Sequence, residues 1–370
     1  METDNTAKQL TSQHIGPHRL RNQRITGQKC QTPAQVVTWM GALQAQDYHQ
    51  ALWAIGLRLQ SPSVATVEQA IEAGHILRTW PMRGTIHFVP PADAKWMLKL
   101  SAARMLAADG RRLSQLDLTH ATMVQCETLL SNALGGGQRL TREAIMNLLE
   151  DAGISTAGQR GYHILWYLAQ SGSICLGPMS GKQQTFVLLD EWVPHPRNLP
   201  REEALAELAA RFFTSHGPAT LADFARWSGL TIADARLGLQ MNGSTFIATT
   251  INGTAYWLSA EDQMPNTSES GGVSFLPGFD EYILGYKDRS DVIAAEHAHK
   301  IVPGNNGIFF PTIVIDGQIV ATWKRKLKRK SIDITIDPFT PLGDWTEPVR
   351  AAANAYSDFL GLPIDSITIS

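Results

Sequence analysis

The stretch TLADFARWSGLTIADARLGLQMNGSTFIATTINGTAYWL, residues 220–258, decides the fold class of this sequence. Thr220 is a typical helix N-cap residue, and the pattern of apolar residues predicts short helices over 220–228 and 232–239. The segment 244–258 then reads as two strands around Asn252-Gly253, a dipeptide typical of a two-residue hairpin turn. With a further helix over 204–213, helices followed by a hairpin predict a winged helix over 193–262.

The same order of elements occurs earlier in the chain. Thr141 opens a predicted helix that ends at Asp151, and a second helix follows over 162–171 after a glycine-containing turn. The stretch SICLGPMSGKQQTFVLLD (173–190) then reads as two strands around a Gly/Ser/Lys loop. We therefore predict another winged helix over 119–192, separated from the next by the proline-rich WVPHPRNLP (192–200).

The N-terminal region, 1–118, resembles this pattern more weakly. Thr32 and Pro33 predict a helix start, and that helix is expected to run to about Leu43. Further helices are expected over 51–59 and 64–73, a strand or hairpin over 83–89, and a long helix over 92–112. The region could thus be a third, degenerate copy of the winged helix.

The last hundred residues differ in character. VSFLPGFDEYILGY (273–286) and GIFFPTIVIDGQIVATWKRKLKRKSIDITI (307–336) look strand-like, with Asp316-Gly317 as a hairpin turn. A Gly/Ser/Asn linker, MPNTSESGG (264–272), precedes them, and an amphipathic helix is expected over 351–360. The prediction is an α+β protein of tandem winged helices with a β-rich C-terminal domain over 270–370.

The charge of the chain is small in total but unevenly distributed. The 370 residues suit two or three domains, and 32 basic against 34 acidic residues give a net charge of -2. Yet 5–46 holds five basic residues and no acid, 74–112 holds seven against two, and 318–331 holds six against none. These three segments carry +16, which allows a phosphate-binding surface. Solvated faces are the plainer explanation, and the run 324–330 is also explained by protection of an exposed strand edge.

Several classes of protein are disfavoured by what the sequence lacks. Cys30, Cys126 and Cys175 form no CxxC pair, so we expect reduced thiols in a cytoplasmic protein. No secretory signal or membrane-spanning run of about 18 apolar residues is visible. Nucleotide-binding, zinc-protease and hydrolase motifs are missing, and His297 and His299 have no third ligand nearby. We expect no metal and no cofactor.

The pair Gln44 and Gln46 stands out in LQAQD (43–47). On a helix, residues two apart point about 200° apart, whereas an extended segment places both on one face. The helix must therefore end near Leu43 or Gln44 if both act together, although two polar residues at an ordinary helix end fit the spacing as well. Adjacent Asp280 and Glu281 are a weaker candidate, as an acid/base pair, because neighbouring side chains usually point apart.

Four stretches in order resemble the AlkZ/YcaQ family of winged-helix DNA glycosylases, over about 15–360. They are GALQAQDYHQALWAIGLRL (41–59), TWPMRGTIHFVPPADAKWML (79–98), PGFDEYILGYKDRS (277–290) and VIDGQIVATWKR (314–325). The family's catalytic motif is Gln-Φ-Gln in the AlkZ branch and Gln-Φ-Asp in the YcaQ branch. Gln44-Ala45-Gln46 matches the AlkZ form with a small central residue, and Asp47 leaves the acid as an alternative to Gln46.

The resemblance implies a C-shaped monomer around a channel for double-stranded DNA. Its expected activity is hydrolysis of the N-glycosidic bond of purines alkylated at N7 or N3, including interstrand crosslinks, by a water that Gln44 and Gln46 position. No lysine lies close to these glutamines in sequence, which agrees with a glycosylase without a Schiff-base lyase step. Candidate contacts to phosphate or groove are Arg83, His87, Lys287 and Arg289. Alternatives are a non-catalytic DNA-binding or regulatory protein and an enzyme that acts on a small molecule.

Overall fold

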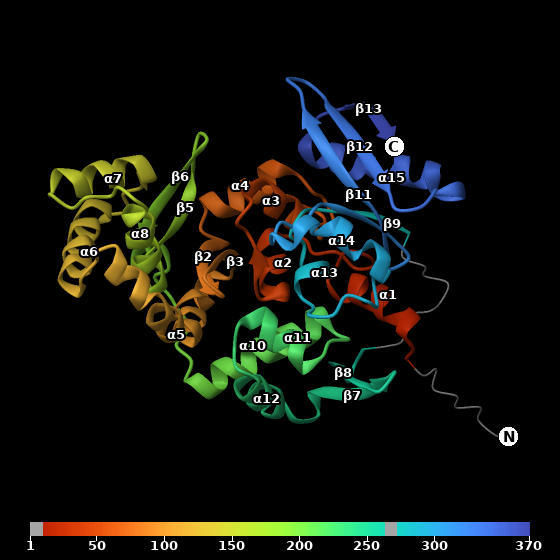
Figure 1. Cartoon of the computed structure of the whole chain (residues 1–370), viewed down its shortest axis with the longest axis horizontal. Coiled ribbons are helices and arrows are strands. Elements are labelled where there is room, and N and C mark those ends of the chain that lie inside the picture. Colours follow the sequence, from red (N-terminus) through yellow and green to blue (C-terminus); the bar gives the residue numbers. More distant parts are fainter. Residues whose placement is uncertain (1–9, 263–271) are drawn as a thin grey trace.

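The computed structural model describes residues 10–262 and 272–370 as a mixed α+β protein. Almost all of the linker expected over 264–272 lies outside the described residues. In Figure 1, α6–α8 with the β5–β6 hairpin lie on one side, α10–α12 lie below the centre, and the C-terminal sheet lies on the opposite side. Within the described residues, no helix has the length and apolar character needed to cross a membrane.

The N-terminal helices are α1 (Ser12–Asn22), α2 (Pro33–Met40), α3 (Tyr48–Gly56) and α4 (Val64–Glu72). Helix α2 ends at Met40, before the expected Leu43, because Gly41 adopts a φ of 76°. The chain then enters strand β1 (Leu43–Gln44). Helix α3 starts three residues earlier than expected, because the side chain of Asp47 accepts a hydrogen bond from the backbone N–H of Gln50.

A β-hairpin follows these helices. It consists of β2 (Leu77–Met82) and β3 (Thr85–Val89), so it begins six residues before the strand expected over 83–89. Arg83 and Gly84 form its turn, both at positive φ. Helix α5 (Ala94–Gln115) then leads into the next unit.

The second unit has the predicted order of helices and hairpin. It contains α6 (His120–Leu134), which the sequence reading missed, and then β4 (Leu140–Thr141), α7 (Arg142–Asp151), α8 (Arg160–Gln170), β5 (Ile174–Ser180), β6 (Gln183–Leu188) and α9 (Leu189–Trp192). Its strands continue the sheet of the N-terminal region, in the order β1-β3-β2-β5-β6-β4. One sheet thus crosses the boundary expected at 118–119.

The third unit agrees closely with the local pattern of residues 220–258. Its elements are α10 (Arg201–His216), α11 (Leu221–Ser228), α12 (Ile232–Gln240), β7 (Phe246–Ile251) and β8 (Thr254–Ser259). Thr220 and Asp223 form a capping box at α11. Asn252 and Gly253, at φ values of 49° and 79°, make the predicted hairpin turn.

The C-terminal part has a sheet in the order β13-β12-β11-β10-β9. Its elements are β9 (Val273–Leu276), α13 (Glu281–Leu284), α14 (Ala298–Ile301), β10 (Thr312–Ile315), β11 (Gln318–Leu327), β12 (Ile332–Pro338), α15 (Thr346–Leu360) and β13 (Ile364–Ile369). The expectation of strand over 273–286 is wrong beyond residue 276, because Asp280 caps helix α13. Strand β11 lies between β10 and β12, but β10 pairs only with its first half, up to Thr322, so residues 324–327 pair with β12 alone, and protection of a strand edge by the basic run 324–330 stays a prediction.

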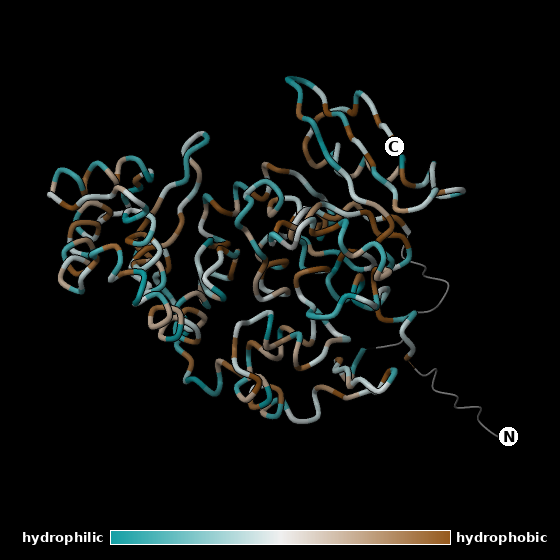
Figure 2. Tube along the Cα trace, viewed as in Figure 1, coloured by the Kyte–Doolittle hydropathy of each residue, from teal (hydrophilic) through white to brown (hydrophobic). Residues whose placement is uncertain are grey.

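One hydrophobic core joins the N-terminal helices to the C-terminal sheet. In it, the ring of Tyr356 lies 5.2 Å from that of Trp53 and 4.9 Å from that of Trp323. Two further cores lie under α10–α12 and within α6–α8. Figure 2 shows the hydrophilic tips of the β5–β6 and β11–β12 hairpins, away from these cores. The first of these cores contains Leu43 of β1 and Tyr282 of α13, so it holds together two elements that are far apart in sequence.

Candidate functional site

Gln44 lies on strand β1 at the edge of the six-stranded sheet, and Gln46 lies in the bend that follows it. Gln44 pairs with His87 of β3, and the backbone N–H of Ala45 donates to the carbonyl of Ile86 at 2.8 Å. The side chains of Gln44 and His87 therefore project from the same face of the sheet. The backbone N–H of Gln46 donates to Oε1 of Gln44 at 3.3 Å. The structure thus places the two glutamines in contact, with Gln44 almost buried and Gln46 exposed.

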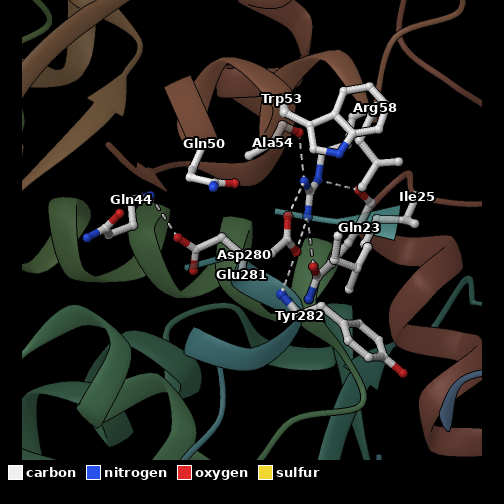
Figure 3. A network of polar contacts seen from close by, with 12 residues as sticks. Gln23, Ile25, Gln44, Gln50, Trp53, Ala54, Arg58, Asp280, Glu281 and Tyr282 are labelled. Carbon is white, nitrogen blue, oxygen red and sulfur yellow. Dashed lines mark hydrogen bonds and ion pairs between the residues drawn. The ribbon is translucent and has the colours of Figure 1, made fainter. Parts of the chain in front are cut away.

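A buried carboxylate completes this edge strand. The N–H of Gln44 donates to Oε1 of Glu281 at 2.9 Å, and Nε1 of Trp227 donates to Oε2 at 2.9 Å. Figure 3 shows Glu281 reaching from helix α13 to the backbone of Gln44. Burial alone would raise the pKa of Glu281, but His216, His87 and Arg83 outweigh it and lower the pKa to about 2. A negative charge is therefore fixed beside the two glutamines.

Asp280, the neighbour of Glu281, has a different partner. Its two oxygens accept from Nη1 and Nη2 of Arg58 at 2.9 and 3.0 Å, and both side chains are fully buried. Arg58 also donates to the carbonyls of Ala54 and Gln23 and to the side chain of Gln23. With the two bonds to Asp280, all five N–H groups of the Arg58 guanidinium are used. The two carboxylates therefore bind separate partners. Each of their oxygens accepts a hydrogen bond from within the protein, whereas an acid/base pair would present its oxygens to a substrate.

His87 and Arg83 contact each other in the β2–β3 hairpin. Nδ1 of His87 donates to the carbonyl of Thr85 at 2.9 Å, and Nε2 accepts from Nη2 of Arg83 at 3.2 Å. Burial, and then the charge of Arg83, lowers the pKa of His87 to about 4, so the ring is neutral at pH 7. His87 is fully buried, so in this conformation it supports Arg83 and has no surface for contact with DNA. Arg83 itself is partly exposed and lies against Gly229 at the end of α11.

The other two predicted cations lie on the segment after α13. Lys287 is exposed, and Arg289 is partly buried, with Nε donating to the carbonyl of Ile283 at 2.8 Å. Burial, and then the charge of Arg226, lowers the pKa of Arg289 to about 10. Arg226 also contributes to the lowered pKa of Arg83, so it lies near both groups. This exposed arginine of α11 was missed by sequence reasoning, because only the fold brings it to Arg83.

A second missed arginine touches the backbone between the two glutamines. Nη2 of Arg78 donates to the carbonyl of Ala45 at 3.1 Å, and the guanidinium lies 4.9 Å from the ring centre of Tyr48. Its other groups, Nε and Nη1, are buried without a partner among the described residues. Burial lowers the pKa of Arg78 to about 10. An arginine in an otherwise apolar strand was the only signal of this role in the sequence.

An open hollow of about 590 Å³ lies beside Gln46. The residues that line it are Gln46, Asp47, Tyr48, Phe279, Asn306, Gly307 and Ile308. A larger hollow of about 830 Å³, between α2 and α10, contains neither glutamine of the motif. Within residues 10–262 and 272–370, no group of three His, Cys, Asp or Glu is placed to hold a metal ion.

The chemistry available at this site follows from its groups. The amides of Gln44 and Gln46 can accept hydrogen bonds from a water molecule and donate to it, but they cannot take up its proton at neutral pH. The unprotonated carboxylate of Glu281 favours a positive charge developing nearby. Such a site suits a reaction whose leaving group needs no proton and whose transition state is cationic.

Three comparisons with known proteins bear on this site. A family model described as "DNA glycosylase AlkZ-like" matches residues 37–359. The "Interstrand DNA cross-link repair glycosylase" of Streptomyces sahachiroi is 26% identical over 325 residues, which are 83% of this chain and 85% of that protein. The solved structure of Streptomyces sahachiroi DNA glycosylase AlkZ superimposes with a TM-score of 0.80 at 22% identity, covering 98% of this chain and 100% of the other. The last comparison shows a shared fold.

Proposed function

The chain belongs to the AlkZ-like family of DNA glycosylases, and from this premise we propose that it hydrolyses the N-glycosidic bond of purines alkylated at N7 or N3. The name of the Streptomyces relative suggests interstrand crosslinks as a second class of substrate. Gln44 and Gln46 position the water in this proposal. The observation that carries it is the contact of the two residues at the end of β1, where the backbone N–H of Gln46 donates to Oε1 of Gln44 and Gln46 lines a hollow.

The reaction needs no general acid. Alkylation at N7 or N3 leaves a positive charge on the purine, and cleavage of the C1′–N9 bond delivers the electron pair that neutralises this charge. The sugar becomes oxocarbenium-like, the water oxygen bonds to C1′, and its proton passes to solvent. Oε1 of Gln44 accepts from the N–H of Gln46 and keeps a second lone pair for the water. The amide of Gln46 then limits the directions from which that water can approach.

The buried charge of Glu281 supports the same transition state. Its Oε1 lies 2.9 Å from the backbone nitrogen of Gln44, so a negative charge lies directly beside strand β1 at the site. In the part of the chain that the structure describes, no lysine lines the hollow, which fits a water nucleophile and no Schiff-base lyase step.

For the DNA complex, we propose that a monomer surrounds duplex DNA in a C shape. The regions 1–118, 119–192 and 193–262 supply tandem winged helices, the first of them degenerate, and 270–370 supplies the β-rich domain. Arg83, Lys287 and Arg289 contact phosphates, while His87 holds Arg83 from inside. Such contacts make binding of undamaged DNA salt-sensitive.

The decisive experiment uses a duplex oligonucleotide with one N7-methylguanine. Excision is measured in single turnovers by alkaline cleavage of the abasic site. Gln44→Ala and Gln46→Ala should each slow excision by about 100-fold or more, with nearly unchanged affinity for undamaged duplex. Gln138→Ala, which changes an exposed glutamine outside the site, is the matched control. Binding of undamaged DNA without any abasic-site formation by the unaltered protein would overturn the proposal in favour of a DNA-binding protein.

A further inference from the structure

The loop that precedes α13 is clamped against the segment 44–58 at three points. The N–H of Gly278 donates to Oε1 of Gln50 at 3.0 Å, Asp280 binds Arg58 through two hydrogen bonds, and Glu281 accepts from the N–H of Gln44. Figure 3 shows Gln50, Arg58 and Gln44 arranged along this loop. The clamps fix the residues on both sides of Phe279.

Phe279 itself is held in a conformation that residues with a side chain rarely adopt. Its φ is 61°, in the left-handed region that favours glycine. Its ring lies 6.1 Å from that of Phe309 and lines the hollow next to Gln46. Strain of this kind persists where the surrounding structure imposes it, and it concentrates at binding and catalytic sites. The hydrogen bonds on both sides of Phe279 therefore hold its aromatic ring at the wall of the hollow.

The hollow combines aromatic surface with one negative charge. Phe279 and Tyr48 provide rings, and Ile308, which is 50% exposed, provides an apolar edge. Asp47 is exposed and is the one charged residue among the described residues that line the hollow. A volume of about 590 Å³ suits a small-molecule site with room for substituents. A ring face and a carboxylate together attract a flat cation.

Resting on the function proposed above, we propose that this hollow binds the positively charged base of the lesion. The face of Phe279 stacks on the alkylated purine, and the carboxylate of Asp47 provides the opposite charge. Because Gln46 lines the same hollow, a base held there brings its sugar to the water-positioning amides. An undamaged purine carries no charge, so the hollow favours the lesion before any bond breaks.

Phe279→Gly tests the ring without straining the backbone, since glycine adopts the positive φ freely. We expect the thermal midpoint to stay equal or rise and single-turnover excision of N7-methylguanine to fall about 10-fold, within a range of 5- to 100-fold. Phe279→Leu, which keeps an apolar side chain but no ring face, should lose a similar factor. Phe339→Leu changes a ring outside the hollow and should leave the rate unaltered.

Asp47→Asn tests the charge, because asparagine retains the N-cap of α3. In a Gln44→Ala background, the affinity ratio between lesion-bearing and undamaged duplex is measured at low salt. Asp47→Asn and Phe279→Gly should each reduce that ratio several-fold, with unchanged affinity for undamaged duplex. Unaltered ratios and unaltered excision rates in both variants would overturn this inference while the unaltered protein still makes abasic sites. Failure of the proposed function appears differently, as the absence of abasic sites with the unaltered protein.

Discussion

Replacing Glu281 by glutamine removes a buried charge with almost no change in shape. Its two oxygens accept from the N–H of Gln44 and from Nε1 of Trp227, both at 2.9 Å. A glutamine has one carbonyl oxygen and one NH₂ group, so only one of the two donors keeps an acceptor. The other donor then faces a second donor inside the protein.

The cost in stability can be worked out from these two hydrogen bonds. A hydrogen bond to a charged group contributes roughly 1.5–3 kcal/mol, and one such bond is lost while the other loses its charge, so the expected loss is about 2–4 kcal/mol. Separately, the pKa of Glu281 lies at about 2 instead of its ordinary 4.5, because His216, His87 and Arg83 outweigh the effect of burial, and this shift adds a pH-dependent contribution to stability. Because this pKa is lowered in the folded protein, that stability is present above pH 4.5 and is lost as the pH falls to about 2.

Urea unfolding at pH 7 measures this loss, and Glu261→Gln, at an exposed position, is the matched control. A double-mutant cycle with Trp227→Phe removes the second donor, so the two changes should be non-additive by more than 1 kcal/mol. The Glu281→Gln variant should also lose less stability than the unaltered protein between pH 4.5 and 2. A change below 1 kcal/mol, or additivity in the cycle, would refute the described role of Glu281.

Three further outcomes are expected. Asp280→Asn, which leaves the buried Arg58 charge uncompensated, should destabilise the protein by roughly 3–5 kcal/mol in the same urea assay. The pKa of His87 is lowered from 6.5 to about 4, so about 3 kcal/mol of stability is lost as the pH falls from 6.5 to 4, and His87→Gln should flatten this part of the pH profile. Lys287→Ala should weaken binding to all duplexes alike and reduce the salt dependence of log K by about 0.9, whereas an unchanged salt slope would exclude a phosphate contact.

Local signals in the sequence predicted the elements that depend on local chemistry. Thr220 caps α11 and Asn252-Gly253 turns the β7–β8 hairpin as expected, because both effects act within a few residues. The resemblance to AlkZ-like glycosylases identified the family and drew attention to Gln44 and Gln46. Helix starts were less accurate, as at α3, where the cap by Asp47 decides the first residue.

What the sequence did not predict depends on distant partners. Gln44 is extended because β1 pairs with β3, about forty residues later, and its N–H finds an acceptor in Glu281, 237 residues away. Phe279 and Arg78 looked like ordinary apolar and charged residues until the fold placed them at the hollow and at the backbone of Ala45. A pattern of neighbouring residues contains no information on such pairs.

The 237-residue separation between Gln44 and Glu281 also sets the order in which a ribosome can complete this protein. At roughly 5–20 residues per second, about 12 to 50 seconds pass between synthesis of the two residues. During that interval the N–H of Gln44 lacks its acceptor, and the core shared by the N-terminal helices and the C-terminal sheet lacks half of its members. A nascent or prematurely terminated chain therefore lacks the carboxylate, and its site is complete only when the last quarter of the chain has been made.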